Sequence, residues 1–338
     1  MTLKTRITEL LGIEHPVMLA GLGGVGLSKL AAAVSEAGGL GTIALVGLSP
    51  EVIHREIAAA RRLTAKPLAV NLLVPFIRPG IIEAVLGEPI DAVSLFWGDS
   101  NEHTARIKRA GMKVIWQCGS VGEAVAACRA GADAIVVQGI DAGGHVRGKA
   151  TSLALIPAVR DALGAEMPIL AAGGFADGRG LAAALALGAD GVALGTRFVA
   201  STEAAAHPLY QQRLLAAQAE DTVLTTLYDV GWPNAGHRVI RTRVVDEWES
   251  AGHPEPGKRP GEGEPIGVLR QGGLELALAK YSVVTPSENV AGDIDELPHY
   301  AGMSVNLIHE VLPAGEIVRR IVGEAQEVIA RRLASVVV

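Results

Sequence analysis

The chain has 338 residues and a net charge of −6; 49 % of the residues are hydrophobic, 20 % are charged and only 4 % are aromatic. This composition excludes a disordered or collagen-like chain, and the negative charge provides no field that would attract nucleic acid or an anionic membrane. A core built from Ala, Val, Leu and Ile favours parallel strands covered by helices.

The cysteines and the spacing of charged residues indicate the environment of the chain. Cys118 and Cys128 form no CxxC pair, which excludes a disulfide scaffold and a Cys-rich zinc or iron–sulfur site. The longest stretches without Asp, Glu, Lys or Arg, residues 15–28 and 37–50, have 14 residues each, whereas a membrane crossing takes about 20. We therefore expect a cytoplasmic protein with no membrane segment and no nucleic-acid partner.

Short apolar runs alternate with helical segments over the first 200 residues. The predicted strands are residues 16–20, 40–46, 68–73, 91–96, 113–118, 134–138, 168–172 and 191–194. Predicted helices between them include residues 28–37, 50–63, 120–130 and 177–187. Eight strand–helix units joined by short links predict a closed parallel (β/α)8 barrel, the TIM barrel, rather than an open doubly wound sheet.

The composition changes after residue 220. The segment 221–300 holds Trp232, Trp248 and a stretch rich in Pro, Gly and charge at 251–267. We predict a barrel over residues 1–220 that carries the cofactor, an insertion or lid over the active site at 221–310, and a C-terminal region 311–338. The apolar spacing at 313–333 predicts a closing helix that packs back on the barrel.

Glycine-rich exits of strands seven and eight give the strongest signal for a ligand site. Gly173 and Gly174 follow the seventh strand, and Gly195 and Thr196 follow the eighth. Barrels commonly bind phosphate between these two loops, where glycine leaves backbone N–H groups accessible. Glycines that merely make tight turns are the alternative.

The exit of strand one, Gly21-Leu22-Gly23 and onward to Gly26, also satisfies G-x-G-x-x-G. A dinucleotide site would need an acidic residue at the end of strand two, and none is present. The loop therefore favours close approach of a flat ligand to the backbone.

His145 stands in a glycine-rich exit after strand six, next to Gly143 and Gly144. An imidazole there can donate to an anionic oxygen or move a proton near neutral pH, although a packing role is the alternative. The other eight histidines have no such context, and we predict no metal site.

Amide side chains lie at three further strand ends, at Asn71, Gln117 and Gln138. They can hydrogen-bond the polar edge of a heteroaromatic ring, or they are buried structural amides. No Lys or Glu stands at a strand end as a Schiff-base lysine or enolising carboxylate. Cys118 is interpreted as core packing.

The chain resembles the nitronate monooxygenase family, formerly called 2-nitropropane dioxygenases. The resemblance rests on HPVMLAGLGGVG at 15–26, QGIDAGGHVRG at 138–148, the segment 171–201 with AAGG and GTRF, and YAGMSVNLI at 300–308. The superfamily also contains flavin enoyl-acyl-carrier-protein reductases and NADH:quinone reductases.

The resemblance implies a barrel that binds FMN without a covalent bond. Its phosphate would lie on Gly173, Gly174, Gly195 and Thr196, and Gly21, Leu22 and Gly23 would line one side of the isoalloxazine. Asn71, Gln117, Gln138 and Gly143, with Gly144 beside it, would surround the polar edge. His145 matches the active-site histidine of the family.

We therefore expect an FMN-dependent oxidoreductase that oxidises alkyl nitronates with O2 to a carbonyl compound and nitrite. One alternative is an NAD(P)H-dependent flavin reductase of quinones or enoyl thioesters; another is a flavin-free barrel isomerase or lyase acting on a sugar phosphate. The oligomeric state is not fixed by the sequence, and a homodimer is the candidate.

Overall fold

The computed structural model describes residues 2–99, 101–271 and 273–336. Eight parallel strands form one sheet in the order β1-β9-β8-β6-β5-β4-β3-β2. A parallel bridge between Met18 and Leu40 joins the two ends of the sheet and closes it into a barrel. The strands are β1 (Val17–Leu19), β2 (Gly41–Ala44), β3 (Leu68–Leu73), β4 (Ala92–Phe96), β5 (Lys113–Cys118), β6 (Ala134–Gln138), β8 (Ile169–Ala172) and β9 (Gly191–Leu194). Each lies within a predicted strand, and the TIM barrel is confirmed.

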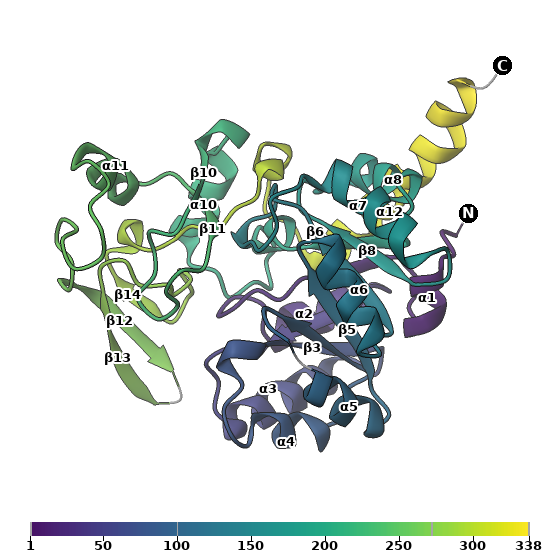
Figure 1. Ribbon diagram of the computed structural model, residues 1–338, viewed down its shortest axis with the longest axis horizontal. Helices are drawn as coiled ribbons and strands as arrows, with labels where there is room; N and C mark the ends of the chain where they lie inside the picture. The colour runs from purple at the N-terminus through teal and green to yellow at the C-terminus, as the bar shows by residue number, and fades with distance from the viewer. Residues whose placement is uncertain (1, 100, 272, 337–338) are drawn as a thin grey trace.

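Helices follow the strands and cover the outside of the barrel (Figure 1). They are α2 (Ser28–Glu36), α3 (Pro50–Leu63), α4 (Ile81–Leu86), α5 (Asn101–Arg109), α6 (Val121–Arg129), α7 (Ser152–Leu163) and α8 (Gly178–Ala186). Outside this ring, α1 (Arg6–Leu11) precedes β1, and α9 (Thr196–Val199) and α10 (Pro208–Ala216) follow β9. Short 3₁₀ turns lie at Val74–Phe76, Ala219–Asp221, Ile294–Glu296 and Met303–Leu307. None of the helices in the described ranges has the length and apolar character that a membrane crossing requires.

Successive side chains along the strands point alternately into two hydrophobic cores, one between strands and helices and one inside the barrel. In β6, Ile135 and Val137 belong to the cluster between strands and helices, whereas Ala134 and Val136 belong to the cluster inside the barrel. Because successive side chains of a strand point to opposite faces, one apolar strand serves both cores. Ile7 of α1 joins the inner cluster and is fully buried. The filled interior leaves the strand exits as the surface where a site can form.

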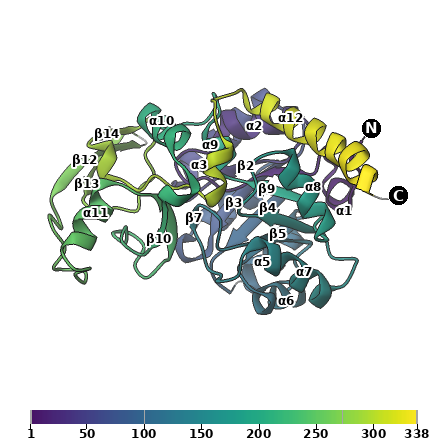
Figure 2. The same cartoon turned by 90° about the horizontal axis from the view of Figure 1, so that it is seen from above.

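Residues 221–310, the lid, form two antiparallel sheets beside the barrel (Figures 1 and 2). The elements are β10 (Thr222–Thr225), β11 (His237–Ile240), α11 (Arg243–Ser250), β12 (Pro265–Gln271), β13 (Leu274–Ala279) and β14 (Val290–Gly292). The first sheet, β10-β11-β7, includes β7 (Gly144–His145) from the loop after β6. The lid and the barrel are therefore joined through a strand that carries His145.

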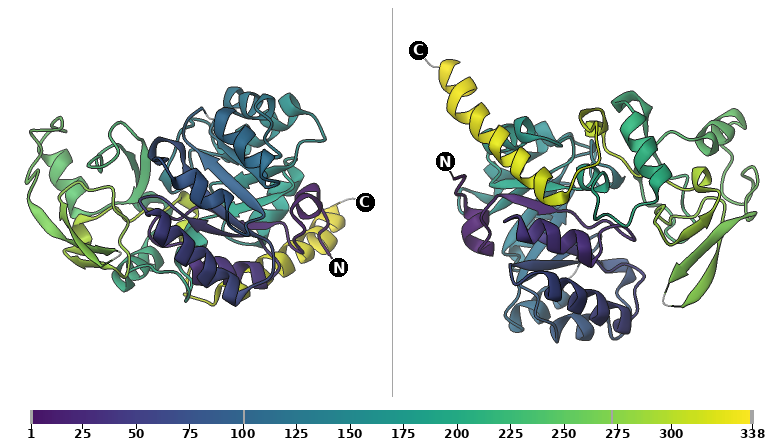
Figure 3. Two further views of the ribbon diagram at one scale, coloured as in Figure 1. Left: turned by 90° about the horizontal axis from the view of Figure 1, so that it is seen from below. Right: turned by 180° about the vertical axis from the view of Figure 1, so that it is seen from behind.

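The C-terminal helix α12 (Ala314–Glu327) packs against α8 and α2. Ile317, Val318 and Ile321 are buried on its inner side. The predicted helix 313–333 is only partly α-helical, because Val328–Leu333 winds as a wider π-helix and Ala334–Val336 as a 3₁₀ turn. Both chain ends lie on the side away from the lid (Figure 3). The division of the chain into three regions at residues 220 and 310 stays a prediction. Residues 1, 100, 272 and 337–338, which fall within the three regions, lie outside the described residues.

Candidate active site

The exits of β8 and β9 present unpaired backbone N–H groups. Gly173 and Gly174 have φ of +92° and +79°, a conformation that suits glycine because it has no Cβ. Within the described part of the chain, the N–H groups of Gly173, Gly174, Gly195 and Thr196 have no protein acceptor. Four such donors on adjacent loops suit an anion, and a phosphate in particular.

Asp141 and Ser152 join the loop after β6 to the loop after β8 by hydrogen bonds. The Asp141 carboxylate accepts from the Ser152 backbone N–H at 3.1 Å and lies against its hydroxyl. The same hydroxyl is 2.6 Å from the Gly173 carbonyl oxygen. A Cβ added at Gly174 would stand 3.2 Å from Asp141 Oδ2. The exits of β6 and β8 are thus tied together, with little room for a side chain at Gly174.

The segment 300–304 contacts the loops that follow β6 and β9. Sequence reasoning missed this segment as part of the site. The Gly302 N–H donates to Thr196 Oγ1 at 3.1 Å, and the Met303 N–H donates to the Asp141 carbonyl at 2.9 Å. A Cβ at Gly143 would overlap the backbone of Gly302. The signal was present in the YAGMSVNLI motif, to which no role had been given.

The exit of β1 forms another wall of the site. A Cβ at Gly21 would overlap the side chain of Asn71, which is buried and donates from Nδ2 to the Ser94 carbonyl at 3.3 Å. A Cβ at Gly195 would come within 3.3 Å of Leu22 Cδ2. Gly21 and Leu22 therefore lie between the Asn71 amide of β3 and the loop after β9 that begins at Gly195.

The three other predicted positions of this wall and its polar edge differ in their surroundings. Gly23 faces Val46, where a Cβ would be too close. Gln138 is buried; its Nε2 donates to the His145 carbonyl at 3.0 Å, and its Oε1 has no partner among the described residues. Gln117 is half-buried and lines a groove of about 760 Å³ together with Trp97 and Arg147.

His145 lies in an enclosure of rings. Its imidazole stacks on Trp232 at 4.0 Å between ring centroids and 24° between planes. The Trp97 ring meets it edge-on at 6.1 Å, and Tyr300 lies at 5.5 Å. Trp97 has φ of +65°, an uncommon conformation for a bulky residue and one that clusters at functional sites. The loop predicted around His145 is in fact the strand β7, because residues far along the chain pair with it.

His237 is the cross-strand partner of His145. The rings lie 5.2 Å apart. His237 is fully buried; its Nδ1 is 2.8 Å from the Ala235 carbonyl, and its Nε2 accepts from the Tyr228 N–H at 3.4 Å. These partners fix it as a neutral imidazole. The interpretation that no other histidine had a relevant context was wrong, since strand pairing brings His237 to the site.

Burial sets the protonation of His145. Desolvation, with a smaller contribution from His237, lowers the pKa of the His145 imidazole to about 3. The Nε2 atom is buried and has no hydrogen-bond partner in the described residues. At neutral pH the site therefore presents an uncharged imidazole with a free nitrogen.

The residues present fit a phosphorylated, flat, polar heterocycle. The unpaired N–H groups after β8 and β9 suit the phosphate of such a ligand, and the glycines after β1 suit close approach of its ring to the backbone. Gln138 Oε1 has no hydrogen-bond partner among the described residues and can accept from the ligand. The fold and the site together define a class, the TIM-barrel oxidoreductases that hold a flavin at their strand exits. The chain belongs to the nitronate monooxygenase family, whose model matches residues 4–80 and 78–324.

Relatives and solved structures agree with this assignment. The chain is 41 % identical over 252 residues to a (3aS,4S,5R,7aS)-5-hydroxy-7a-methyl-1-oxo-octahydro-1H-indene-4-carboxyl-CoA dehydrogenase of Mycobacterium tuberculosis, covering 74 % of this chain and 70 % of the relative. It is 33 % identical to a probable nitronate monooxygenase of Staphylococcus saprophyticus, covering 67 % and 77 %. FabK from Thermotoga maritima superposes with a TM-score of 0.84 at 33 % identity, covering 99 % of this chain and all of the other. A nitroalkane oxidase from Streptomyces ansochromogenes superposes at 0.75 with 27 % identity, covering 98 % and 100 %.

The chain is therefore a flavin-dependent oxidoreductase. Membership of this oxidoreductase family overturns the alternative of a flavin-free isomerase or lyase.

Proposed function

We propose that the chain binds FMN and oxidises alkyl nitronates with O2, with His145 as the group that handles the substrate. The observation that carries the proposal is the neutral His145 imidazole, whose Nε2 is desolvated and has no partner among the described residues. Bound FMN would supply the electron acceptor and pass the reducing equivalents to O2, so that the products are a carbonyl compound and nitrite.

FMN would be held mainly by backbone. The N–H groups at Gly173, Gly174, Gly195 and Thr196 would bind its phosphate. The glycines at 21 and 23 with Leu22 would face one side of its ring, and Gln138 Oε1 would accept from the polar edge. Asn71, Gln117, Gly143 and Gly144 complete the predicted set at that edge.

These loops would bind one terminal phosphate, and no second glycine-rich loop is followed by the acidic residue that an adenosine ribose would need. Cofactor released by heat and separated by chromatography should therefore be FMN. Release of FAD would overturn the assignment of the phosphate.

His145 can act on the substrate in two ways. An imidazole that is neutral at pH 7 can accept the α proton of a neutral nitroalkane at a free ring nitrogen, or donate its N–H to the nitro oxygens of a nitronate. The aromatic rings around it exclude water, which strengthens either interaction. No carboxylate contributes to the pKa of His145, so the imidazole would not be held as a cation.

Anaerobic flavin reduction tests the proposal. A preformed alkyl nitronate should bleach the bound flavin without NADH, and admission of O2 should restore the yellow colour with release of nitrite. Bleaching by NADH or NADPH alone, with none by nitronates, would contradict nitronate oxidation and favour a reductase of quinones or enoyl thioesters.

A second candidate, oxidation of a coenzyme A thioester, is favoured by two observations. The relatives at 41 % and 39 % identity carry the name of a carboxyl-CoA dehydrogenase. The groove of about 760 Å³ at Trp97, Gln117 and Arg147 also continues along α6 as far as Ala130, which offers a place for part of a ligand longer than a nitroalkane. Anaerobic bleaching by an acyl-CoA but not by nitronates would select this candidate.

A further inference from the structure

Trp232 is the residue of the lid that contacts the imidazole face of His145. It lies in the turn between β10 and β11 and is only 8 % exposed. Besides stacking on His145, its ring meets Trp97 at 4.8 Å and Phe76 at 4.9 Å, both edge-on. Trp97 and Phe76 follow strands β4 and β3 of the barrel. The lid thus inserts one side chain among the rings at the barrel mouth.

Stacking takes the place of the hydrogen bond that usually orients such a histidine. A reactive imidazole is commonly fixed by a hydrogen bond on its second nitrogen. Neither ring nitrogen of His145 has a hydrogen bond to a described residue. The backbone is well held, since Gln138 donates to the His145 carbonyl and the Val146 N–H donates to the Gly236 carbonyl at 2.8 Å. The orientation of the ring itself therefore depends on its stacking partner.

We propose that Trp232 is a positioning residue for His145, which orients the imidazole and keeps water from its Nε2. The inference rests on the proposed function, because it takes His145 as the group that handles the substrate. The lid is on this view part of the reactive site, not merely a cover. A barrel whose lid stands away would present a His145 that is free to rotate and is hydrated.

The ionisable groups around His145 leave desolvation as the main influence on its charge. His237 of β11 is neutral and hydrogen-bonded at both nitrogens, and the Tyr300 hydroxyl donates to the Val283 carbonyl at 2.9 Å. On the far side of Trp97, Arg147 lies 5.3 Å from the ring and is paired with Glu123 at 2.7 Å. Removing Trp232 would hydrate the imidazole and raise its pKa from about 3 toward the ordinary value near 6.5.

The experiment compares Trp232→Ala with Trp232→Phe and a matched control. Trp248→Ala removes another lid tryptophan, one that meets His253 at 4.5 Å outside the site. Each purified holoprotein is mixed anaerobically with nitroethane between pH 4 and 9, and the rate of flavin reduction is recorded. For Trp232→Ala we expect at least a tenfold loss at pH 7 and an acid limb that appears above pH 4, where the parent, with a His145 pKa of about 3, should show none. Trp232→Phe should stay within about threefold of the parent, as should Trp248→Ala.

A double-mutant cycle with His145→Ala separates this inference from the proposed function. If Trp232 acts through His145, then adding Trp232→Ala to His145→Ala should change the rate less than twofold. Equal losses in both backgrounds, or an acid limb unmoved in Trp232→Ala, would overturn the positioning role while leaving the function in place. A parent rate in His145→Ala alone would overturn the function itself. Should Trp232→Ala lose its flavin, Trp232→Leu takes its place. Because leucine keeps apolar volume without a ring, we expect at least a tenfold loss at pH 7 with little movement of the acid limb, and a rate within threefold of the parent would overturn the positioning role.

Discussion

The barrel and the lid are stabilised in different ways. The barrel packs apolar strands against apolar helices, and its two clusters are composed of aliphatic and small residues with few aromatic ones. The lid contains more buried charge: its buried charged residues are Arg238, Arg259, Lys280 and Glu296, whereas those of the barrel are Asp190 and Arg197. Arg259 is 3 % exposed at its side chain and contacts Asp229 at 2.8 Å, Glu262 at 2.5 Å and the ring of Tyr281 at 4.2 Å.

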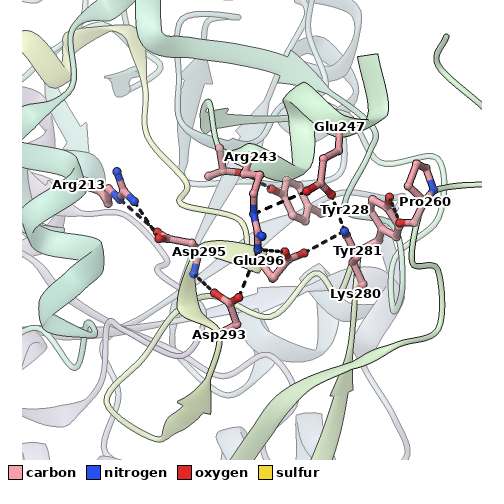
Figure 4. A network of polar contacts seen from close by, with 11 residues as sticks. Arg213, Tyr228, Arg243, Glu247, Pro260, Lys280, Tyr281, Asp293, Asp295 and Glu296 are labelled. Atoms are coloured by element: carbon pink, nitrogen blue, oxygen red, sulfur yellow. Dashed lines mark hydrogen bonds and ion pairs between the residues drawn. The ribbon is translucent and has the colours of Figure 1, made fainter. Parts of the chain in front are cut away.

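A second network extends through the lid (Figure 4). Lys280 contacts Glu247 at 2.7 Å and Glu296 at 3.4 Å, and Arg243 reaches Glu296 from α11. Charged groups taken out of water need their partners, so such a network specifies one arrangement and tolerates loss of a partner poorly. On the proposed function, the barrel would hold the cofactor with backbone groups, whereas the position of Trp232 in the lid depends on specific side-chain pairs.

Gly174→Asp, a substitution in the barrel, should have the largest effect of the variants: loss of cofactor binding. The change adds a carboxylate where the phosphate would bind, beside Asp141, at a φ of +79°. We expect loss of FMN and hence of all activity, with affinity lowered at least about 100-fold by like-charge repulsion.

Gly111→Asp is the matched control for Gly174→Asp. Gly111 has φ of +85°, and no atom would meet an added Cβ. Both variants share the backbone strain of a left-handed residue, which costs about 1–2 kcal/mol. Absorbance of the purified proteins at flavin wavelengths measures occupancy, and a fully yellow Gly174→Asp would refute the location of the phosphate.

His145→Ala tests the junction of the two regions. Flavin should be retained, because its binding rests on other groups, and the reductive step with a neutral nitroalkane should slow on the order of 10²- to 10⁴-fold. If His145 is a base, the loss with preformed nitronate should be smaller; if it anchors the nitro group, both losses should be similar. Rapid mixing under anaerobic conditions distinguishes them, with the exposed His309→Ala as control.

Arg259→Met should loosen the lid and spare the barrel. The substitution leaves Asp229 and Glu262 without their cation, and because both carboxylates are partly exposed we expect a cost of about 1.5–3 kcal/mol, that of a hydrogen bond to a charged group. Limited proteolysis should cut within residues 221–310 faster than in the parent, while the flavin stays bound. Arg270→Met, which removes a fully solvated pair with Glu275, should leave the cleavage rate unchanged. Equal cleavage of both variants would refute the special role of the buried pair.

Lowering the pH should destabilise the lid, and we expect this effect to be the smallest of those predicted. The hydrogen bond from Arg259, followed by backbone N–H groups, lowers the pKa of Glu262 to about 2 from its ordinary value of 4.5. Because the folded pKa is depressed, this contribution to stability is present above pH 4.5 and disappears as the pH falls toward 2. Lid cleavage by an acid-active protease should therefore rise between pH 5 and pH 3, and Glu262→Gln should reduce that dependence. A flat profile in the parent would contradict the prediction.

The sequence by itself determined the barrel and the glycine turns after β8 and β9. Strand positions follow from short apolar runs, and Gly173 and Gly174 stand where a tight exit needs positive φ, so local chemistry suffices. The cap of α8 is equally local, because Asp177 accepts from the Gly180 N–H three residues later at 3.1 Å.

Only the tertiary structure decided the surroundings of His145. Trp232, His237 and Tyr300 are separated from it by more than 80 residues in the printed sequence, and no local period relates them. They meet because the antiparallel pairing of β7 with β11 turns a barrel loop into a lid strand. Strand pairing between distant segments depends on the register of the whole lid and on its buried ion pairs, and therefore on contacts that no single stretch of sequence encodes.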